Sequence, residues 1–384
     1  MKIRHLKSAK IWRNTLLGLV LILLASGFTF ISCAPTGATA KGWAGVTVSE
    51  NSLIVASMEG KVNILDATNH TRRWPKDAAI TMTTGGGFGC SSGTAGVAIY
   101  GAPAVWKDLV YIGGYDGRVY AINAGTGADR WVYPRQGYLK PIVGGLLVSG
   151  DRLYFGDSDG KVYALDAATG DLIWQFSTGD AIWSLPVVDG GTLYIGSFDK
   201  KLYALNAADG SKKWELTTTG AISASALVYN NTVYIGSFDR SIYAANAADG
   251  NLKWKSFQAG NWFWSRPLLY NGNIYAASID GKVYVVNPNN GDKVAEIDLA
   301  SPVSSSPVLS DNAIIAATES GKIYSINTQS NEKTLLTTLK AKIFAPLAIT
   351  NGVIYVHSAD DIMYAVDAKA GTALWNFDLK ARQE

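Results

Sequence analysis

The residues best suited to bind a partner or a ligand lie in one short segment, residues 260–267, which reads GNWFWSRP. Flat aromatic rings and a permanent guanidinium charge carry much of the energy in binding hot spots. The equivalent segment of the preceding repeat, residues 221–225, is the much smaller AISAS. The binding candidates are therefore Trp262, Phe263, Trp264 and Arg266. The alternative is that these rings plug the axis of the fold or pack between its repeating units.

A second candidate is the glycine-rich stretch of residues 84–93, which includes Phe88 and Cys90. It belongs to an insertion that makes the first repeat longer than the others. The sequence does not favour phosphate binding, because no Gly-Lys-Ser/Thr motif and no helical pattern follow the glycines. Cys90 has no His nearby in the sequence that could activate a thiolate. We interpret the stretch as a flexible flap, and a specific binding loop that uses Phe88 is the alternative.

The residue types that bind metals are scattered. Two cysteines, Cys33 and Cys90, and three histidines, His5, His70 and His357, show no metal-ligand spacing. Aspartates recur once per repeat, at Asp116, Asp159, Asp199, Asp239, Asp280 and Asp360. Calcium requires six or more converging oxygen atoms, whereas these carboxylates should be spread around a ring. We therefore predict that they form turns and that the chain binds no metal.

These candidates are positioned by a pattern that occurs eight times between residues 54 and 375. A clear copy is LYIGSFDKKLYALNAADGSKKW, residues 193–214. The second residue of the copy recurs at Ile54, Tyr111, Tyr154, Tyr194, Tyr234, Tyr275, Ile315 and Tyr355. The successive spacings are 57, 43, 40, 40, 41, 40 and 40 residues. A constant period near 40 residues is typical of propellers and solenoids, whose repeats bury apolar surface only against one another.

Each repeat predicts four short antiparallel strands. Residues 193–196 and 202–205 are rich in aromatic and branched side chains and flank a turn, and this turn is Asp-Gly in three repeats, a strong hairpin signal. One strand precedes this pair, and the last strand carries a tryptophan in six repeats: Trp74, Trp131, Trp174, Trp214, Trp254 and Trp375. We expect these tryptophans to dock on the neighbouring repeat, with softer joints where Ala295 and Leu335 replace them. The chain should thus be an all-β, eight-bladed propeller of four-stranded blades, with no strand exchanged between its first and last blades.

The segments that link successive blades should end beside the central axis. Counting back three residues from the position equivalent to Pro186 gives a predicted ring around the funnel mouth: Tyr100, Val143, Trp183, Ser223, Trp264, Ser304 and Ile343. We therefore add Tyr100 and Trp183 to the binding candidates, on the same face as Phe88. Trp183 and Trp264 could alternatively serve as stacking platforms for a carbohydrate.

The pattern A-x-D/N-A-x-x-G-x-x-x-W, together with Y-x-G-S-x-D-G, resembles the repeat of the pyrroloquinoline-quinone-like propellers. The resemblance covers roughly residues 42–379. It implies either a calcium-dependent quinoprotein dehydrogenase or a non-enzymatic protein similar to the BamB-type outer-membrane assembly lipoproteins. The dehydrogenases place adjacent cysteines beside the quinone, whereas Cys90 stands alone, and no Asp, Glu and Asn set is assignable to calcium and a base. The resemblance therefore favours a non-enzymatic protein without a quinone cofactor.

The first 33 residues predict an export signal. Five Lys and Arg residues precede an almost entirely apolar stretch, residues 15–30, and Ser32-Cys33 resembles a bacterial lipoprotein processing site. We expect Cys33 to be lipidated, and the alternatives are an uncleaved membrane anchor and simple secretion. The predicted organisation is a signal or anchor at 1–33, a linker at 34–41, the propeller at 42–379 and a tail at 380–384.

Charge argues against one class of partner. The chain has 34 Lys and Arg against 31 Asp and Glu, but residues 1–32 contain five of the basic residues and no acid, so the remainder has a net charge of −2. No basic stripe is left to neutralise the phosphates of a nucleic acid. We therefore expect an exported, membrane-anchored, monomeric propeller that serves as a scaffold for a protein partner in the cell envelope. A quinoprotein dehydrogenase and a carbohydrate-binding protein are the alternatives.

Overall fold

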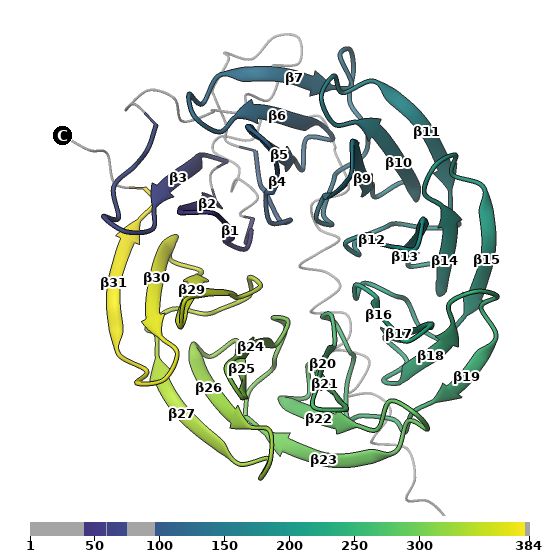
Figure 1. Ribbon diagram of the computed structural model, residues 1–384, viewed down its shortest axis with the longest axis vertical. Coiled ribbons are helices and arrows are strands. Elements are labelled where there is room, and N and C mark those ends of the chain that lie inside the picture. Colours follow the sequence, from purple (N-terminus) through teal and green to yellow (C-terminus); the bar gives the residue numbers. More distant parts are fainter. Residues whose placement is uncertain (1–41, 59, 75–96, 381–384) are drawn as a thin grey trace, which may run out of the picture. The chain divides into compact units, whose positions relative to one another are not determined.

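The computed structural model describes residues 42–58, 60–74 and 97–380. Within these residues the chain forms 31 strands in eight antiparallel sheets, which stand around a central axis like the blades of a propeller (Figure 1). The prediction of an all-β, eight-bladed propeller is therefore confirmed. No helix of this described part is long and apolar enough to cross a membrane. Three predicted segments lie outside the described residues: the signal with Cys33, the linker, and all of the tail except its first residue.

The blades follow one another along the chain, and each uses consecutive strands. Blades 1 and 2 contain β1 (Thr47–Ser49), β2 (Ser52–Ala56), β3 (Val62–Asp66) and then β4 (Ala104–Trp106), β5 (Leu109–Gly113), β6 (Val119–Asn123), β7 (Asp129–Tyr133). Blades 3 and 4 contain β8 (Leu147–Ser149), β9 (Arg152–Gly156), β10 (Lys161–Asp166), β11 (Leu172–Ser177) and then β12 (Val187–Asp189), β13 (Thr192–Gly196), β14 (Lys201–Asn206), β15 (Lys212–Thr217). Blades 5 and 6 contain β16 (Leu227–Tyr229), β17 (Thr232–Gly236), β18 (Ile242–Asn246), β19 (Leu252–Lys255) and then β20 (Leu268–Tyr270), β21 (Asn273–Ala277), β22 (Lys282–Val286), β23 (Lys293–Asp298). Blades 7 and 8 contain β24 (Val308–Ser310), β25 (Ala313–Ala317), β26 (Lys322–Asn327), β27 (Lys333–Thr338) and then β28 (Ala348–Thr350), β29 (Val353–His357), β30 (Ile362–Asp367), β31 (Ala373–Asp378). The first strand of a blade is innermost and the last is outermost (Figure 1).

Blade 1 shows three of its four predicted strands within the described residues. In the described residues after β3, only an isolated bridge joins Leu65 to Arg72, and the N–H of Arg73 donates to the carbonyl of Ile64 at 2.8 Å. Trp74 nevertheless docks on blade 2, where its Nε1 donates to the carbonyl of Ala124 at 2.7 Å. The tryptophan joint of blade 1 is therefore of the same kind as those of the following blades.

Most of the recurring aspartates stabilise the hairpin between the second and third strands, as predicted, but in blade 3 Asp157 does so in place of Asp159. In blade 4, one carboxylate oxygen of Asp199 accepts the N–H of Lys201 at 3.0 Å, and the other accepts the hydroxyl of Tyr203 at 2.6 Å. The following residue has a positive φ, which glycine adopts without strain; it is Gly117 in blade 2 (φ 74°) and Lys200 in blade 4 (φ 73°). The carboxylate of Asp199 also accepts the N–H of Gly179, in the preceding link, at 2.7 Å, so it joins the hairpin to that link.

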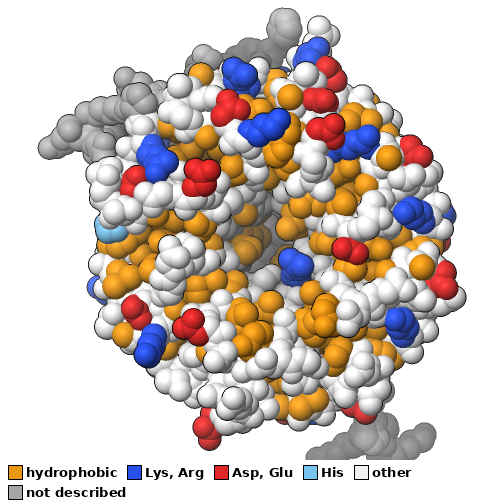
Figure 2. Space-filling model, viewed as in Figure 1, with side chains coloured by type: hydrophobic (Ala, Val, Ile, Leu, Met, Phe, Trp, Pro, Cys, Tyr) orange, Lys and Arg blue, Asp and Glu red, His pale blue; other side chains and the backbone are white. Residues whose placement is uncertain are grey.

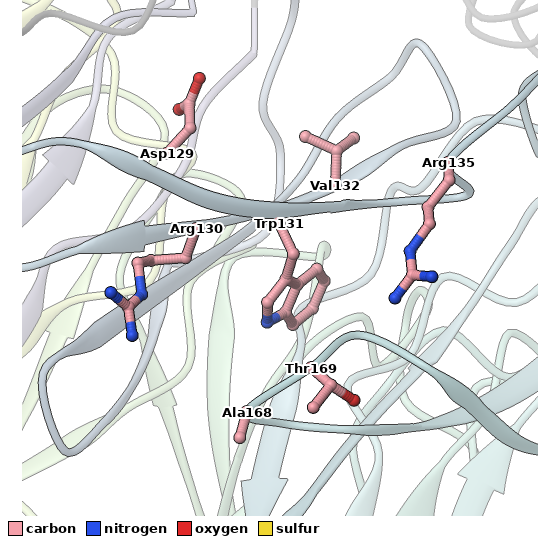
Figure 3. Close-up of a pocket in the computed structure, with 7 residues that line it drawn as sticks. All are labelled: Asp129, Arg130, Trp131, Val132, Arg135, Ala168 and Thr169. Atoms are coloured by element: carbon pink, nitrogen blue, oxygen red, sulfur yellow. The ribbon is translucent and has the colours of Figure 1, made fainter.

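The outer-strand tryptophans dock on the next blade, which confirms this part of the prediction. Nε1 of Trp131 donates to the carbonyl of Ala167 at 3.2 Å, and Trp131 lies against the turn of Ala168 and Thr169 (Figure 3). The same bond is 3.1 Å for Trp174, 3.0 Å for Trp214 and 2.9 Å for Trp254. Trp375 instead lies 4.4 Å from the ring of His70, centre to centre, across the closure of the ring.

Blade 7 lacks a tryptophan, and the residue that packs against blade 8 in its place differs from the predicted one. Its β-bulge falls between Ile323 and Tyr324, two positions earlier than the equivalent bulges of blades 6 and 8. Leu335 is consequently exposed, and Leu336 packs against the core between blades 7 and 8. The residue that replaces the tryptophan is therefore Leu336, one position later than the alignment of the repeats indicated.

Neighbouring blades interlock through a small residue on one and a large residue on the next. A Cβ added to Gly156 would lie 2.2 Å from the side chain of Ile182, and one added to Gly236 would lie 2.5 Å from Cβ of Phe263. The link of each following blade thus supplies the side chain that fills the space beside the glycine. Phe263 is only 1% exposed and belongs to the core between blades 5 and 6. Its prediction as a binding residue is therefore wrong.

The ring closes between blades 8 and 1 without exchange of a strand, as predicted, because β1–β3 and β28–β31 form separate sheets. Apolar side chains from both blades share one core: Val46, Leu53, Val55 and Leu65 with Tyr355, Met363, Ala365 and Leu379. His357 occupies the position where the other second strands end in glycine or alanine. Its Nδ1 is 2.7 Å from the carbonyl oxygen of Ala44, and its Nε2 is 2.9 Å from Oδ1 of Asp361. Oδ1 of Asp361 also accepts the N–H of Met58 at 3.0 Å, so this buried pair fastens blade 8 to blade 1 at two points.

Candidate functional site

The segments that link successive blades and the hairpins between second and third strands share one face of the ring, which we call the link face. In blade 4, the N–H of Thr178 donates to the carbonyl of Gly160 in the preceding hairpin at 2.7 Å. The N–H of Phe198, in the hairpin of blade 4 itself, donates to the carbonyl of Ala181 at 2.9 Å. Equivalent bonds recur around the ring, so each link is fixed to the hairpins of the two blades that it joins.

Five aromatic side chains of blades 4 to 6 form a continuous cluster on the link face, which we call the aromatic arc: Trp183, Phe198, Phe238, Trp262 and Trp264. Phe238 stacks on Trp262, with ring centres 4.5 Å apart and planes 9° from parallel, and on Trp264 at 5.4 Å and 18°. Trp183 meets Trp264 edge-on at 6.2 Å. Phe198 lies 4.6 Å from Trp183 and 5.6 Å from Phe238. All five side chains are partly exposed, so the arc presents an apolar surface to solvent.

The structure brings the sequence-derived candidates Trp183, Trp262 and Trp264 together and adds two residues that the sequence reasoning missed. Phe198 and Phe238 follow the strands β13 and β17, in two copies of the sequence Gly-Ser-Phe-Asp. The signal was present in the sequence, because the equivalent residues of most other blades are not aromatic. Because both phenylalanines lie within otherwise regular copies of the repeat, they do not stand out as departures from the pattern.

Arg266 stands in the innermost part of the link that leads into β20. The equivalent residues of the other blades are uncharged: Gly45, Ala102, Gly145, Leu185, Ser225, Ser306 and Pro346. Residues at this position meet between neighbouring blades, since a Cβ on Gly145 would lie 2.8 Å from the side chain of Leu185. Arg266 is therefore the one charged member of this innermost ring of described residues.

The charge of Arg266 is not neutralised by the surrounding described residues. Its backbone N–H donates to Oγ of Ser306 at 3.2 Å, while the side chain is accessible to solvent but flanked by protein. Partial removal from water lowers the pKa of Arg266, and no nearby charge among the described residues acts on it. Because a guanidinium stays protonated at neutral pH even so, a positive charge remains available beside the aromatic arc.

A second aromatic group lies on the other side of the funnel mouth. Trp43 meets Tyr100 edge-on at 4.6 Å and lies 5.9 Å from Phe344, and Tyr100 lies 5.5 Å from Tyr115. Ile343, which was predicted to face the mouth, has no exposed surface. The position was counted from the proline before each first strand. Pro186 lies directly before β12, but Pro346 lies two residues before β28, so the count in blade 8 was wrong by one residue.

Another part of the link face carries charges of both signs. Burial raises the pKa of Glu319, although Ser304 and the positive charge of Lys342 partly oppose this shift. Lys342 is exposed and occupies the position equivalent to Trp262, since the hairpin residue Ala359 donates to its carbonyl as Ile279 does to that of Trp262. Lys342 thus interacts with Glu319, while Arg266 has no such neighbour.

One face of the propeller is shown in Figure 2. It has a hollow at its centre, and hydrophobic side chains gather around this hollow. Most Lys, Arg, Asp and Glu side chains lie nearer the outer rim, although a Lys or Arg borders the hollow. Charge is therefore sparse near the axis on this face of the ring.

A separate shallow groove lies at the outer rim between blades 2 and 3 (Figure 3). It is lined by Asp129, Arg130, Trp131, Val132, Arg135, Ala168 and Thr169. Trp131 is the docking tryptophan of this joint, and Arg135 forms an exposed ion pair with Asp171 at 2.6 Å. The groove is thus explained by the joint between two blades.

The described residues do not fit a calcium-bound quinone. No group of three or more His, Cys, Asp or Glu side chains in residues 42–58, 60–74 and 97–380 could hold a metal ion. The hairpin aspartates bind their own turns and tyrosines; for example, Asp280 accepts the hydroxyl of Tyr284 at 2.7 Å. Phe88 and Cys90, from the glycine-rich stretch, lie outside the described residues.

Comparison with known proteins identifies the family. A family model described as outer membrane protein assembly factor BamB matches residues 7–182, 177–306 and 279–383. The chain belongs to the BamB family. Among solved structures, BamB from Moraxella catarrhalis superposes with a TM-score of 0.67 at 21% identity, covering 82% of this chain and 91% of that one. The computationally designed Ika8 protein gives 0.68 at 16% identity, with 87% and 95% covered.

The BamB-family chain also shares its fold with an enzyme. Quinohemoprotein alcohol dehydrogenase from Comamonas testosteroni superposes with a TM-score of 0.66 at 15% identity, covering 85% of this chain and 71% of the enzyme. In sequence, a curated quinohemoprotein alcohol dehydrogenase of the same organism is 32% identical over 84 residues. That match spans 22% of this chain and only 11% of the enzyme. It therefore extends over a small part of the relative.

Proposed function

We propose that this BamB-family propeller is a non-enzymatic scaffold for protein assembly in the cell envelope. It is tethered to the membrane through lipidated Cys33 or an uncleaved N-terminal anchor, and it binds a protein partner through the link face. The observation that carries the proposal is the aromatic arc, in which Trp183, Phe198, Phe238, Trp262 and Trp264 form one partly exposed surface. Family membership supports the envelope setting.

The composition of the link face matches that of protein interfaces. Tryptophan and arginine are enriched at interface hot spots, and contiguous exposed apolar surface on a soluble domain typically marks an interaction site. The aromatic arc concentrates five rings within three neighbouring blades, with Arg266 beside them. A partner that covers these rings would remove from water apolar area that is exposed in the free protein, and this burial would favour binding.

Site-specific photocrosslinking in envelopes of the source cell tests this proposal. Asp180 is exposed on the link face, and Ala208 is exposed in the turn between β14 and β15 at the opposite face. We expect a photoreactive phenylalanine at position 180 to capture a discrete partner, and the same group at position 208 to capture none. The product should disappear in a Trp264→Ala variant that still folds. Equal capture at both positions, or capture that persists in this variant, would refute binding through the link face.

The dehydrogenase relative supplies a second candidate function. A quinoprotein would bind pyrroloquinoline quinone with calcium, so thermal unfolding of the full chain with and without both ligands separates the two functions. A ligand at a hundredfold its dissociation constant adds about 2.7 kcal/mol of stability. We expect no shift, because the described residues offer no metal-binding group. A clear rise in melting temperature that depends on calcium would favour the enzyme instead.

A further inference from the structure

Resting on the proposed partner-binding role of the link face, we infer what the partner must present to it. The partner inserts an acidic side chain beside an apolar one: the carboxylate pairs with Arg266, and the apolar side chain lies on the aromatic arc. The binding element is thus an acidic peptide segment of a protein, not a basic segment and not a flat cofactor.

The polar side-chain groups of Arg266 and of the aromatic arc are all hydrogen-bond donors. The guanidinium of Arg266 has five N–H donors and no acceptor. Trp183 contributes its indole N–H, which has no partner among the described residues and is covered in this conformation. A covered N–H without a partner is unfavourable, so a turn of the ring toward a ligand oxygen would be favoured. The rings of Phe198, Phe238 and Trp262 provide no acceptor, and the occupant must therefore supply the oxygen atoms.

The charge of the link face selects an anion at Arg266 in particular. Lys342, a basic residue in the link of blade 8 on the same face, already has Glu319 as a neighbour. Within residues 42–58, 60–74 and 97–380, no carboxylate acts on Arg266 in this way, and the seven equivalent positions around the axis carry no charge. A guanidinium pairs with a carboxylate through two parallel hydrogen bonds, which neutralises the charge without disturbing any existing ion pair.

The arrangement of the rings favours a side chain over a flat ligand. Phe238 stacks on both Trp262 and Trp264, so inner ring faces that could enclose a planar molecule already cover one another. The outer faces and edges remain, and they form a broad apolar surface suited to a side chain. A neutral sugar needs acceptors as well as donors around its hydroxyl groups, and the arc has only donors.

Calorimetric titration of the full chain in detergent micelles tests the inference with three blocked peptides. The first is GSGFDGSG, with an acetylated N-terminus and an amidated C-terminus, and the others replace its Asp by Asn or by Lys. We expect the Asp peptide to bind about tenfold more tightly than the Asn peptide, because hydrogen bonds to a charged carboxylate are roughly twice as strong as those to a neutral amide. The Lys peptide should bind more weakly still. The preference for Asp should weaken as the salt concentration rises.

Two matched variants assign the effect to Arg266. Arg266→Gln should abolish the preference for Asp over Asn, whereas Lys342→Gln, which removes the same charge from the same face, should preserve it. Trp264→Leu should weaken the Asp and Asn peptides alike, and thermal melting checks that each variant folds. Equal affinity for the Asp and Asn peptides, no binding of any peptide at about 5 mM, or an unchanged preference in Arg266→Gln would overturn the inference.

The two proposals fail separately. If pyrroloquinoline quinone binds with dependence on Arg266 while the peptides do not, the occupant is a small anion and the acidic peptide is excluded. If position 180 crosslinks a partner but the peptides show no preference for Asp, the scaffold function stands and the chemistry inferred for the partner falls. If the preference for Asp holds but no partner is crosslinked, the site is real and the proposed assembly role falls.

Discussion

The buried contact between His357 and Asp361 should make ring closure sensitive to a single substitution, His357→Ala. The two side chains are 0% exposed. In the native chain, His357 bonds the carbonyl of Ala44 and Oδ1 of Asp361. Removal of the imidazole leaves a buried carboxylate whose remaining hydrogen bond, among the residues that the structure describes, comes from the N–H of Met58.

Breaking a buried ion pair by removing one partner costs about 3–5 kcal/mol. Unfolding entropy is about 2.1 cal/mol/K per residue, which for a ring of roughly 340 residues gives about 0.7 kcal/mol/K. The melting temperature of His357→Ala should therefore fall by about 4–7 °C. A double variant, His357→Ala with Asp361→Gly, should regain about 1–3 kcal/mol, the cost of an unpaired buried polar group. Its sequence at these positions copies the Ala277 and Gly281 pair of blade 6.

Differential scanning calorimetry of the three proteins at neutral pH measures the effect. His70→Ala is the matched control, because His70 lies at the same closure but is partly exposed and contacts only the ring of Trp375 among the described aromatic side chains. This control should melt within about 1–2 °C of the native chain, as surface substitutions usually do. A His357→Ala variant that melts with the native chain, or a double variant no more stable than the single one, would show that apolar packing alone closes the ring.

Three further predictions concern a joint, a carboxyl group and the last blade. Trp214→Phe removes the N–H that donates to the carbonyl of Ala247 at 3.0 Å, so the free energy of unfolding measured in urea should fall by about 1 kcal/mol; a loss no greater than that of Leu252→Ser, at an exposed site, would contradict this. Burial raises the pKa of Glu319, so its contribution to stability is present at acid pH and is lost as the pH rises through the raised pKa. Glu319→Gln should accordingly show a smaller fall in melting temperature than the native chain from about pH 4 to pH 7, and parallel profiles would argue against the shift. Deletion of residues 370–384 removes β31 and should open the ring, so a truncated chain that melts like the full one would disprove the role of this strand in closure.

The sequence predicted the blades well because each blade is defined by local signals. Asp-Gly turns, short branched strands and the tryptophan at a constant spacing identify strands and docking contacts without knowledge of the fold. Trp131 and Trp214 illustrate this, since both donate to the backbone of the next blade as expected. A period of 40 residues transfers such information from the clear repeats to the less regular ones.

The details that the sequence did not predict depend on contacts between blades. Phe263 is buried because Gly236 of the preceding blade leaves room for it, and a hydrophobic residue within a link does not indicate which neighbour it meets. His357 was one of three scattered histidines until the fold placed it against Asp361 and Ala44. Trp43 was missed as a member of the funnel mouth because it lies at the start of the first repeat, where the preceding pattern needed for alignment is absent.

The absence of strand exchange has a consequence for how such a ring changes in evolution. Because every blade uses consecutive strands, a duplicated or deleted stretch of about one repeat carries complete hydrogen-bonded sheets with it. No blade needs a strand from the far end of the chain to complete its sheet. The chain could therefore begin at any link without dividing a sheet. The similarity of the segments at residues 153–174, 193–214 and 233–254 is what copying of whole units followed by divergence would produce. The residues of the aromatic arc, which lie in two of these repeats and in the next one, would then be substitutions that arose after the units were copied.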